Sequence, residues 1–129
     1  MINTEEKWRE AILPESSTIG QAIRNLDQGG IRIVLVVDKA NKLIGTISDG
    51  DIRRGLLKGL DLNSPIARLV NHNALVAPPE MARDMVMQVM VANKIQQIPV
   101  VDDQQQLLGL HLWDEMSTLP ARANLMVIM

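Results

Sequence analysis

The side chains most able to do chemistry form one short run, Ser48-Asp49-Gly50-Asp51, which two arginines follow closely. An apolar run precedes Ser48 and a helical pattern follows it, so Ser48 is expected to cap a helix. At that position its hydroxyl can also donate to a phosphate, because the start of a helix favours negative charge. Asp51 can accept hydrogen bonds from both hydroxyls of a ribose. The spacing therefore predicts a site for a phosphorylated sugar.

Plainer interpretations of these residues stay open. Ser48 can serve as a cap alone, and Asp51 can merely complement the helix dipole. Asp49 and Asp51 could suggest a metal site, but two carboxylates without a third oxygen cluster make a weak cation ligand set, so no metal is predicted. Arg54 lies three residues after Asp51 and can face the same cleft, where it would bind phosphate. Arg53 is expected to point elsewhere. The alternative to phosphate binding is an arginine that is solvated or forms a salt bridge with Asp49.

The elements that position these residues occur twice in the chain. Val36-Val37-Asp38 recurs as Val100-Val101-Asp102, and Leu43-Ile44-Gly45 recurs as Leu107-Leu108-Gly109, both 64 positions later. Each copy has the order helix, strand, turn, strand, helix. One such unit cannot easily cover both faces of its sheet, whereas two units packed sheet to sheet can. We therefore predict an α+β fold with pseudo-twofold symmetry.

Periodicity and turn residues predict the individual elements. In the first copy we expect a helix capped by residues 16–18 and stopped at Gly29-Gly30, strands over 31–37 and 43–47, and a helix over 49–58. In the second copy we expect a helix from Pro79 to about Asn93, strands over 98–101 and 107–112, and a helix starting over 113–118. Between the copies, Ser64-Pro65 predicts a short helix.

Composition excludes several classes of function. The formal net charge is −2, which gives no general attraction to nucleic acid or anionic lipid. Only 2% of residues are aromatic, too few for a base-stacking surface, and there is no cysteine. No apolar run approaches the length of a membrane span, and the polar N-terminus is no signal peptide. We expect a cytoplasmic domain that binds neither nucleic acid nor membranes.

The repeated unit resembles a CBS domain. The resemblance lies in Thr18-Ile19, in the strand ending at Asp38 and in the run Leu43 to Ile52, which contains Ser48 and Asp51. Ile98-Pro99-Val100-Val101-Asp102 resembles the partner repeat. A tandem pair is the usual functional unit of that family. The implied division is an N-terminal segment 1–11, a first repeat 12–59, a connector 60–73, a second repeat 74–119 and a tail 120–129.

The resemblance implies that the cleft between the repeats binds an adenine nucleotide, AMP or ATP, with no required cofactor. The implied nucleotide-binding residues are Thr18, Ile33, Thr46, Ser48, Asp51, Arg54 and Pro99. Leu112 and Glu115 stand in the second copy where the first has Ser48 and Asp51, and the first copy has Leu35 where the second has Pro99. We therefore expect one competent site in each chain.

Residues 48–59, together with Trp8, are similar to the CBS pairs fused in front of sugar-phosphate nucleotidyltransferases. That likeness implies a regulatory module whose tail, residues 124–129, is the start of a missing catalytic domain; a last edge strand is the alternative. No nucleophile–base pair or glycine-rich phosphate loop is present, so we expect no catalysis by the chain itself. Trp8 is expected to pack the N-terminal segment onto the module.

The helix predicted over 79–93 has few polar residues, so its apolar surface is wider than the stripe that one buried side requires. This excess of apolar surface predicts that the helix makes a second contact. The resemblance implies that the contact forms a homodimer, and docking onto the enzyme domain is the alternative. A second hypothesis for the whole chain is a ligand-free structural dimerisation module. The spacing of His72 and His111 suits no metal, so we expect His111 to be partly buried and His72 to lie on a surface loop.

Overall fold

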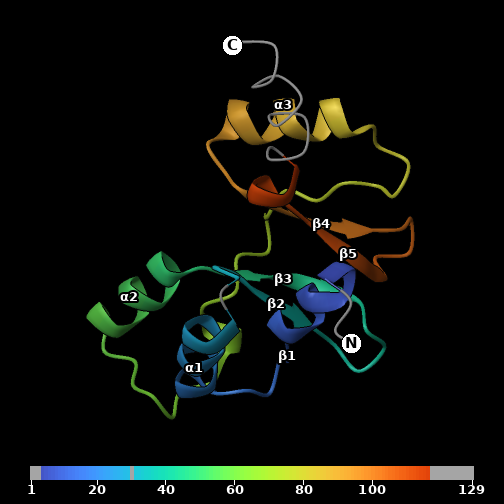
Figure 1. Cartoon of the computed structure of the whole chain (residues 1–129). Coiled ribbons are helices and arrows are strands. Elements are labelled where there is room, and N and C mark those ends of the chain that lie inside the picture. Colours follow the sequence, from blue (N-terminus) through green and yellow to red (C-terminus); the bar gives the residue numbers. More distant parts are fainter. Residues whose placement is uncertain (1–3, 30, 117–129) are drawn as a thin grey trace.

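The computed structural model describes residues 4–29 and 31–116. The elements in chain order are η1 (Thr4–Ala11), β1 (Ile12–Pro14), α1 (Ile19–Gly29), β2 (Val34–Val37), β3 (Leu43–Ile47), α2 (Asp49–Leu57), η2 (Ile66–Arg68), α3 (Arg83–Asn93), β4 (Gln97–Val101) and β5 (Leu107–Leu112). The strands lie in the middle of the molecule, with α1 and α2 on one side and α3 on the opposite side (Figure 1). The predicted α+β architecture is confirmed.

The first sheet has the order β1-β2-β3, with β1 parallel and β3 antiparallel to β2. All four residues of β2 are buried, as expected of a short β-branched run. The predicted strand over 31–37 begins late, at Val34, because the Ile33 amide donates to the Ile31 carbonyl at 2.8 Å instead of joining the ladder. The three-residue strand β1 was not predicted.

The two copies match closely along the chain. α1 and α3 each have 11 residues, and α3 begins and ends 64 positions after α1. Ala77 pairs with Val100 in parallel, as Leu13 pairs with Val36 in the first copy. The antiparallel pair β4-β5 repeats β2-β3.

The start predicted for the second helix was wrong. The helix begins at Arg83 instead of Pro79, because residues before it form a turn in which the Met81 amide donates to the Pro78 carbonyl at 3.1 Å. α1 begins after Thr18, whose hydroxyl accepts from the Gln21 amide at 3.2 Å, as the predicted cap requires.

The connector differs from the prediction in its helix and adds an edge to the first sheet. Its short helix is the 3-10 turn η2, which begins one residue after Pro65. Beyond it, Asn71 pairs with Thr46 of β3, with N···O distances of 2.8 and 3.3 Å. Gly45 permits this close approach, since a Cβ there would lie 2.4 Å from the Asn71 carbonyl oxygen.

Three apolar clusters form the core. One lies within each repeat, and a third joins the two repeats. This third cluster includes Leu35 and Leu43 from the first copy, Leu107 and Leu110 from the second, and Trp8 from η1. Trp8 is 7% exposed, so the N-terminal segment packs on the module as predicted. Among the described residues, none of the helices is long and apolar enough to cross a bilayer.

Candidate functional site

A cavity of about 410 Å³ lies between the two repeats. Six of the seven predicted site residues line it: Ile33, Thr46, Ser48, Asp51, Arg54 and Pro99. The first five belong to the first repeat, and Pro99 comes from β4 of the second. The seventh, Thr18, is not brought together with them, because it caps α1 and lines a different cavity with Arg24 and Asn63.

Ser48 and Asp51 form a capping box at the start of α2. The Ser48 amide and hydroxyl donate to Asp51 Oδ2 at 2.8 and 3.0 Å, and the Asp51 amide donates to Ser48 Oγ at 3.3 Å. The Asp51 side chain is 19% exposed. The two residues therefore cap the helix and also line the cavity.

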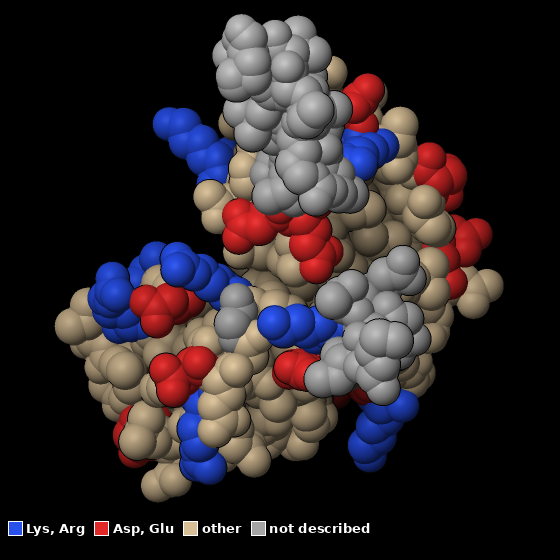
Figure 2. All heavy atoms as spheres, in the orientation of Figure 1, with Lys and Arg blue, Asp and Glu red and all other residues tan. Residues whose placement is uncertain are grey.

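The two arginines of α2 have different surroundings. Arg54 lines the cavity, and its Nη2 donates to Asp51 Oδ1 at 2.5 Å. Arg53 donates to Asp49 at 2.9 Å, where both side chains are more than 70% exposed. Basic and acidic side chains accordingly lie intermixed over α2 (Figure 2). The predicted division, with Arg54 toward the cleft and Arg53 away from it, is what the geometry shows.

The inner wall of the cavity is buried. Ile33 and Thr46 are 8% and 6% exposed, and Pro99 is among the fully buried residues. Pro99 has no amide proton, so β4 cannot donate a backbone hydrogen bond at this point. Its carbonyl accepts from the Ala77 amide at 2.9 Å. Apart from the Thr46 hydroxyl, the side chains of this wall offer apolar contact.

Four amide side chains also line the cavity, together with Ala74, Leu75 and Ile95, and the sequence interpretation missed them. The four amides are those of Asn71, Asn73, Asn93 and Gln97. The 64-residue offset could have found Gln97, which is the counterpart of Ile33. The connector residues Asn71 and Asn73 lie outside the motifs that the two copies share, so the repeat pattern gave no signal for them.

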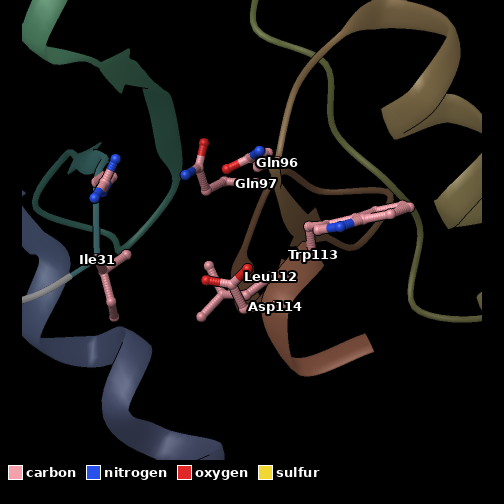
Figure 3. A pocket seen from close by; sticks show the side chains of 7 residues that line it. Ile31, Gln96, Gln97, Leu112, Trp113 and Asp114 are labelled. Atoms are coloured by element: carbon pink, nitrogen blue, oxygen red, sulfur yellow. The ribbon is translucent and has the colours of Figure 1, made fainter. Parts of the chain in front are cut away.

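A second cavity, of about 400 Å³, also lies between the repeats. Figure 3 shows Ile31 on one side of it and Leu112, Trp113 and Asp114 on the other. Leu112 occupies the place that Ser48 has in the first copy, and Glu115, the counterpart of Asp51, is not among the lining residues. This cavity therefore lacks a hydroxyl and a carboxylate at the positions equivalent to Ser48 and Asp51, and its carboxylate comes from Asp114 instead.

Neither histidine is among the residues that line the first cavity. His111 is partly buried in β5 opposite Ile98, and this burial lowers the pKa of its imidazole. His72 is exposed in the connector. Within residues 4–29 and 31–116, no three His, Cys, Asp or Glu side chains are grouped so that they could hold a metal ion.

The sequence has curated relatives that are much longer than this chain. A Helicobacter pylori protein is 33% identical over 107 residues, covering 78% of this chain and 31% of that protein. The arabinose 5-phosphate isomerase GutQ of Salmonella typhi is 27% identical over 94 residues, covering 73% and 29%. The chain thus spans less than a third of the length of these relatives.

Solved structures share the fold over most of the chain. A CBS domain protein from Pyrobaculum aerophilum complexed with AMP is similar with a TM-score of 0.75 and 18% identity, covering 92% of this chain and 91% of that chain. The CBS domain pair of MJ0100, in complex with 5-methylthioadenosine and S-adenosyl-L-methionine, gives 0.74 and 25%, covering 87% and 88%. The CBS domain family matches residues 8–58 and 66–110, and the chain accordingly belongs to this family as a tandem pair.

Proposed function

We propose that this CBS pair is a regulatory, non-catalytic module that binds an adenine nucleotide, AMP or ATP, in the cavity between its repeats. The observation that carries the proposal is that the Ser48–Asp51 capping box lines a cavity whose opposite side includes Pro99 of the second repeat. The adenine-containing ligands of the two similar structures support it.

Each part of the nucleotide has a suitable partner in the lining. Asp51 accepts hydrogen bonds from the ribose hydroxyls, and Arg54 binds the phosphate at the start of α2. Ile33 and Pro99 contact the faces of the adenine ring, and Thr46 lies beside them in β3. Thr18 has no part in this arrangement, because it lines a different cavity.

Binding would act on how the two repeats close. The lining comes from both copies, so a ligand that contacts both favours one relative arrangement over another. We propose that this change controls a catalytic domain of a longer cytoplasmic protein. Residues 48–59 and Trp8 favour a sugar-phosphate nucleotidyltransferase as this catalytic domain, and the sugar-phosphate isomerase among the relatives is the competing candidate. The tail 120–129 lies outside the described residues.

Titration calorimetry with AMP, ATP, GMP and CMP tests the binding. We expect the adenine nucleotides to bind and the GMP and CMP titrations to give little heat. Asp51→Ala should weaken AMP binding, whereas the same chain with Asp49→Ala, on the exposed face of α2, should bind normally. A folded wild-type chain that binds none of the four at millimolar concentration would refute the proposal.

We also propose that the module forms a homodimer through α3. One side of this helix is buried through Val86 and Met90, while Met85 and Val91 are 50% and 64% exposed. Methionine adapts well to such contacts. Sedimentation should show a dimer that Val91→Glu dissociates. A dimer that no nucleotide affects, in a chain where Asp51→Ala changes nothing, would instead favour a ligand-free structural dimerisation module.

A further inference from the structure

The carboxylate of Asp51 has few free acceptor positions. A carboxylate offers about four lone-pair positions. Oδ2 accepts two hydrogen bonds from Ser48, at 2.8 and 3.0 Å, and Oδ1 accepts one from Arg54 at 2.5 Å. About one position therefore remains, whereas the two hydroxyls of a ribose need two. Full engagement of a ribose through Oδ1 requires Arg54 to leave that oxygen.

Arg54 is placed so that it can leave. Its side chain is 65% exposed, while that of Asp51 is 19% exposed. Its guanidinium folds back toward the start of α2, where a Cβ added to Gly50 would lie 3.4 Å from Nη1. A helix start is unfavourable for a cation, so the contact with Asp51 is what holds the guanidinium there. A phosphate at the same place would attract the guanidinium and satisfy the helix start as well.

We infer that the Asp51–Arg54 ion pair makes recognition of ribose and phosphate interdependent, so that this site selects 5′-phosphorylated nucleosides over adenosine and 5-methylthioadenosine. A phosphate draws Arg54 away from Asp51, and the freed Oδ1 then accepts from the ribose. A nucleoside without a phosphate must break the same ion pair, and it makes no new contact with the Arg54 guanidinium that would compensate for the loss. The inference rests on the proposed nucleotide site and names the ligand class that this site takes.

Removal of the Arg54 guanidinium should change the affinities for phosphorylated and unphosphorylated nucleosides in opposite directions. In Arg54→Ala, AMP should bind about tenfold more weakly, because a charge-assisted contact is lost. Adenosine should bind about two- to fivefold more tightly, because no ion pair competes for Asp51. Arg53→Ala removes the same charge from the same helix outside the cavity and should leave both affinities within about twofold.

Inorganic phosphate provides an independent readout. In the wild-type chain, phosphate should tighten adenosine binding by occupying Arg54, and in Arg54→Ala it should have no effect on adenosine. If AMP binds the wild type but Arg54→Ala weakens AMP and adenosine by the same factor, or phosphate leaves adenosine unchanged, the interdependence is overturned while the nucleotide site stands. If AMP fails to bind the folded wild type, the proposed function is overturned as well.

Discussion

Asn41 and Gln105, which lie 64 positions apart, have the same left-handed backbone, with φ of 64° and 68°, and each bonds to the repeat that contains the other. The Gln105 carbonyl accepts from the Leu43 amide at 2.9 Å, and the Asn41 carbonyl accepts from the Leu107 amide at 3.2 Å. The turns of the two hairpins are therefore joined across the pseudo-twofold axis.

This junction lies at the end of β3 opposite to Ser48. β3 starts at Leu43, beside the joined turns, and ends at Ile47, next to the candidate site. The shared core holds the same region together through Leu43 and Leu107. The repeats are thus joined at one end of β3. A ligand bound at the other end would act far from this junction, where a change in the relative orientation of the repeats displaces them most.

The left-handed backbone of Gln105 leads to a prediction for stability. Glutamine is strained at positive φ, whereas glycine is not. We expect Gln105→Gly to raise the free energy of unfolding by about 0.5–1 kcal/mol, measured by urea denaturation. Gln104→Gly, next to it and without positive φ, should lower the stability by a similar amount through added chain entropy. A loss of stability in both variants would show that the backbone at 105 is not left-handed.

A second prediction compares two glycines at equivalent places. In Gly45→Ala the new Cβ would lie 2.4 Å from the Asn71 carbonyl oxygen and 2.5 Å from Val70, so the connector must move away. We expect a loss of about 1–3 kcal/mol in chemical denaturation. In Gly109→Ala the nearest atom, in Val100, lies at 3.9 Å, and the stability should be nearly unchanged. Equal effects in the two variants would contradict the close packing of the connector.

Much of the fold could be predicted because the pattern of each element occurs twice in the sequence. The hairpins were found on both copies, since apolar β-branched strands flank polar turns. The start of the second helix could not be predicted from local sequence. Pro78 and Pro79 suit either the first turn of a helix or a turn before it. The 64-residue offset from α1 and the pairing of Ala77 with Val100 both favour the turn, with the helix starting at Arg83. Such pairing is a tertiary contact that local propensity does not contain.

The site could be predicted where a motif supplied it. Ser48, Asp51 and Arg54 follow one another at intervals of three residues along α2 and its cap, so their proximity follows from helical geometry. Asn71 and Asn73 reach the cavity only because the connector returns to pair with β3. That return depends on the space above Gly45, which no periodicity in the sequence records.

A third prediction concerns the pH dependence of stability. Burial lowers the pKa of His111 in the folded chain below the ordinary value of 6.5. Between the two pKa values the unfolded chain binds more protons, so stability increases with pH and is lost as the pH falls through about 6.5. His111→Ile, which introduces the residue type of Ile47 at the matching position, should remove this component from denaturation curves measured at pH 5 to 8. His72→Gln, on the exposed connector, should leave the pH dependence as it is; if it has the larger effect, the assignment to His111 is wrong.

The fourth prediction separates the two carboxylates at the start of α2. Asp51→Asn keeps the shape of the side chain but removes its charge and one acceptor, so the ribose loses a partner and Arg54 loses its ion pair. We expect AMP affinity, measured by calorimetry, to fall about tenfold or more, with a loss of about 0.5–1 kcal/mol in stability from the weakened cap. Asp49→Asn removes the same charge two residues earlier, outside the cavity, and should change AMP affinity less than about twofold. Because both variants reduce the negative charge of the same helix turn equally, a similar loss in the two would mean that AMP senses only the overall charge of α2, and the assignment of Asp51 to the ribose would fail.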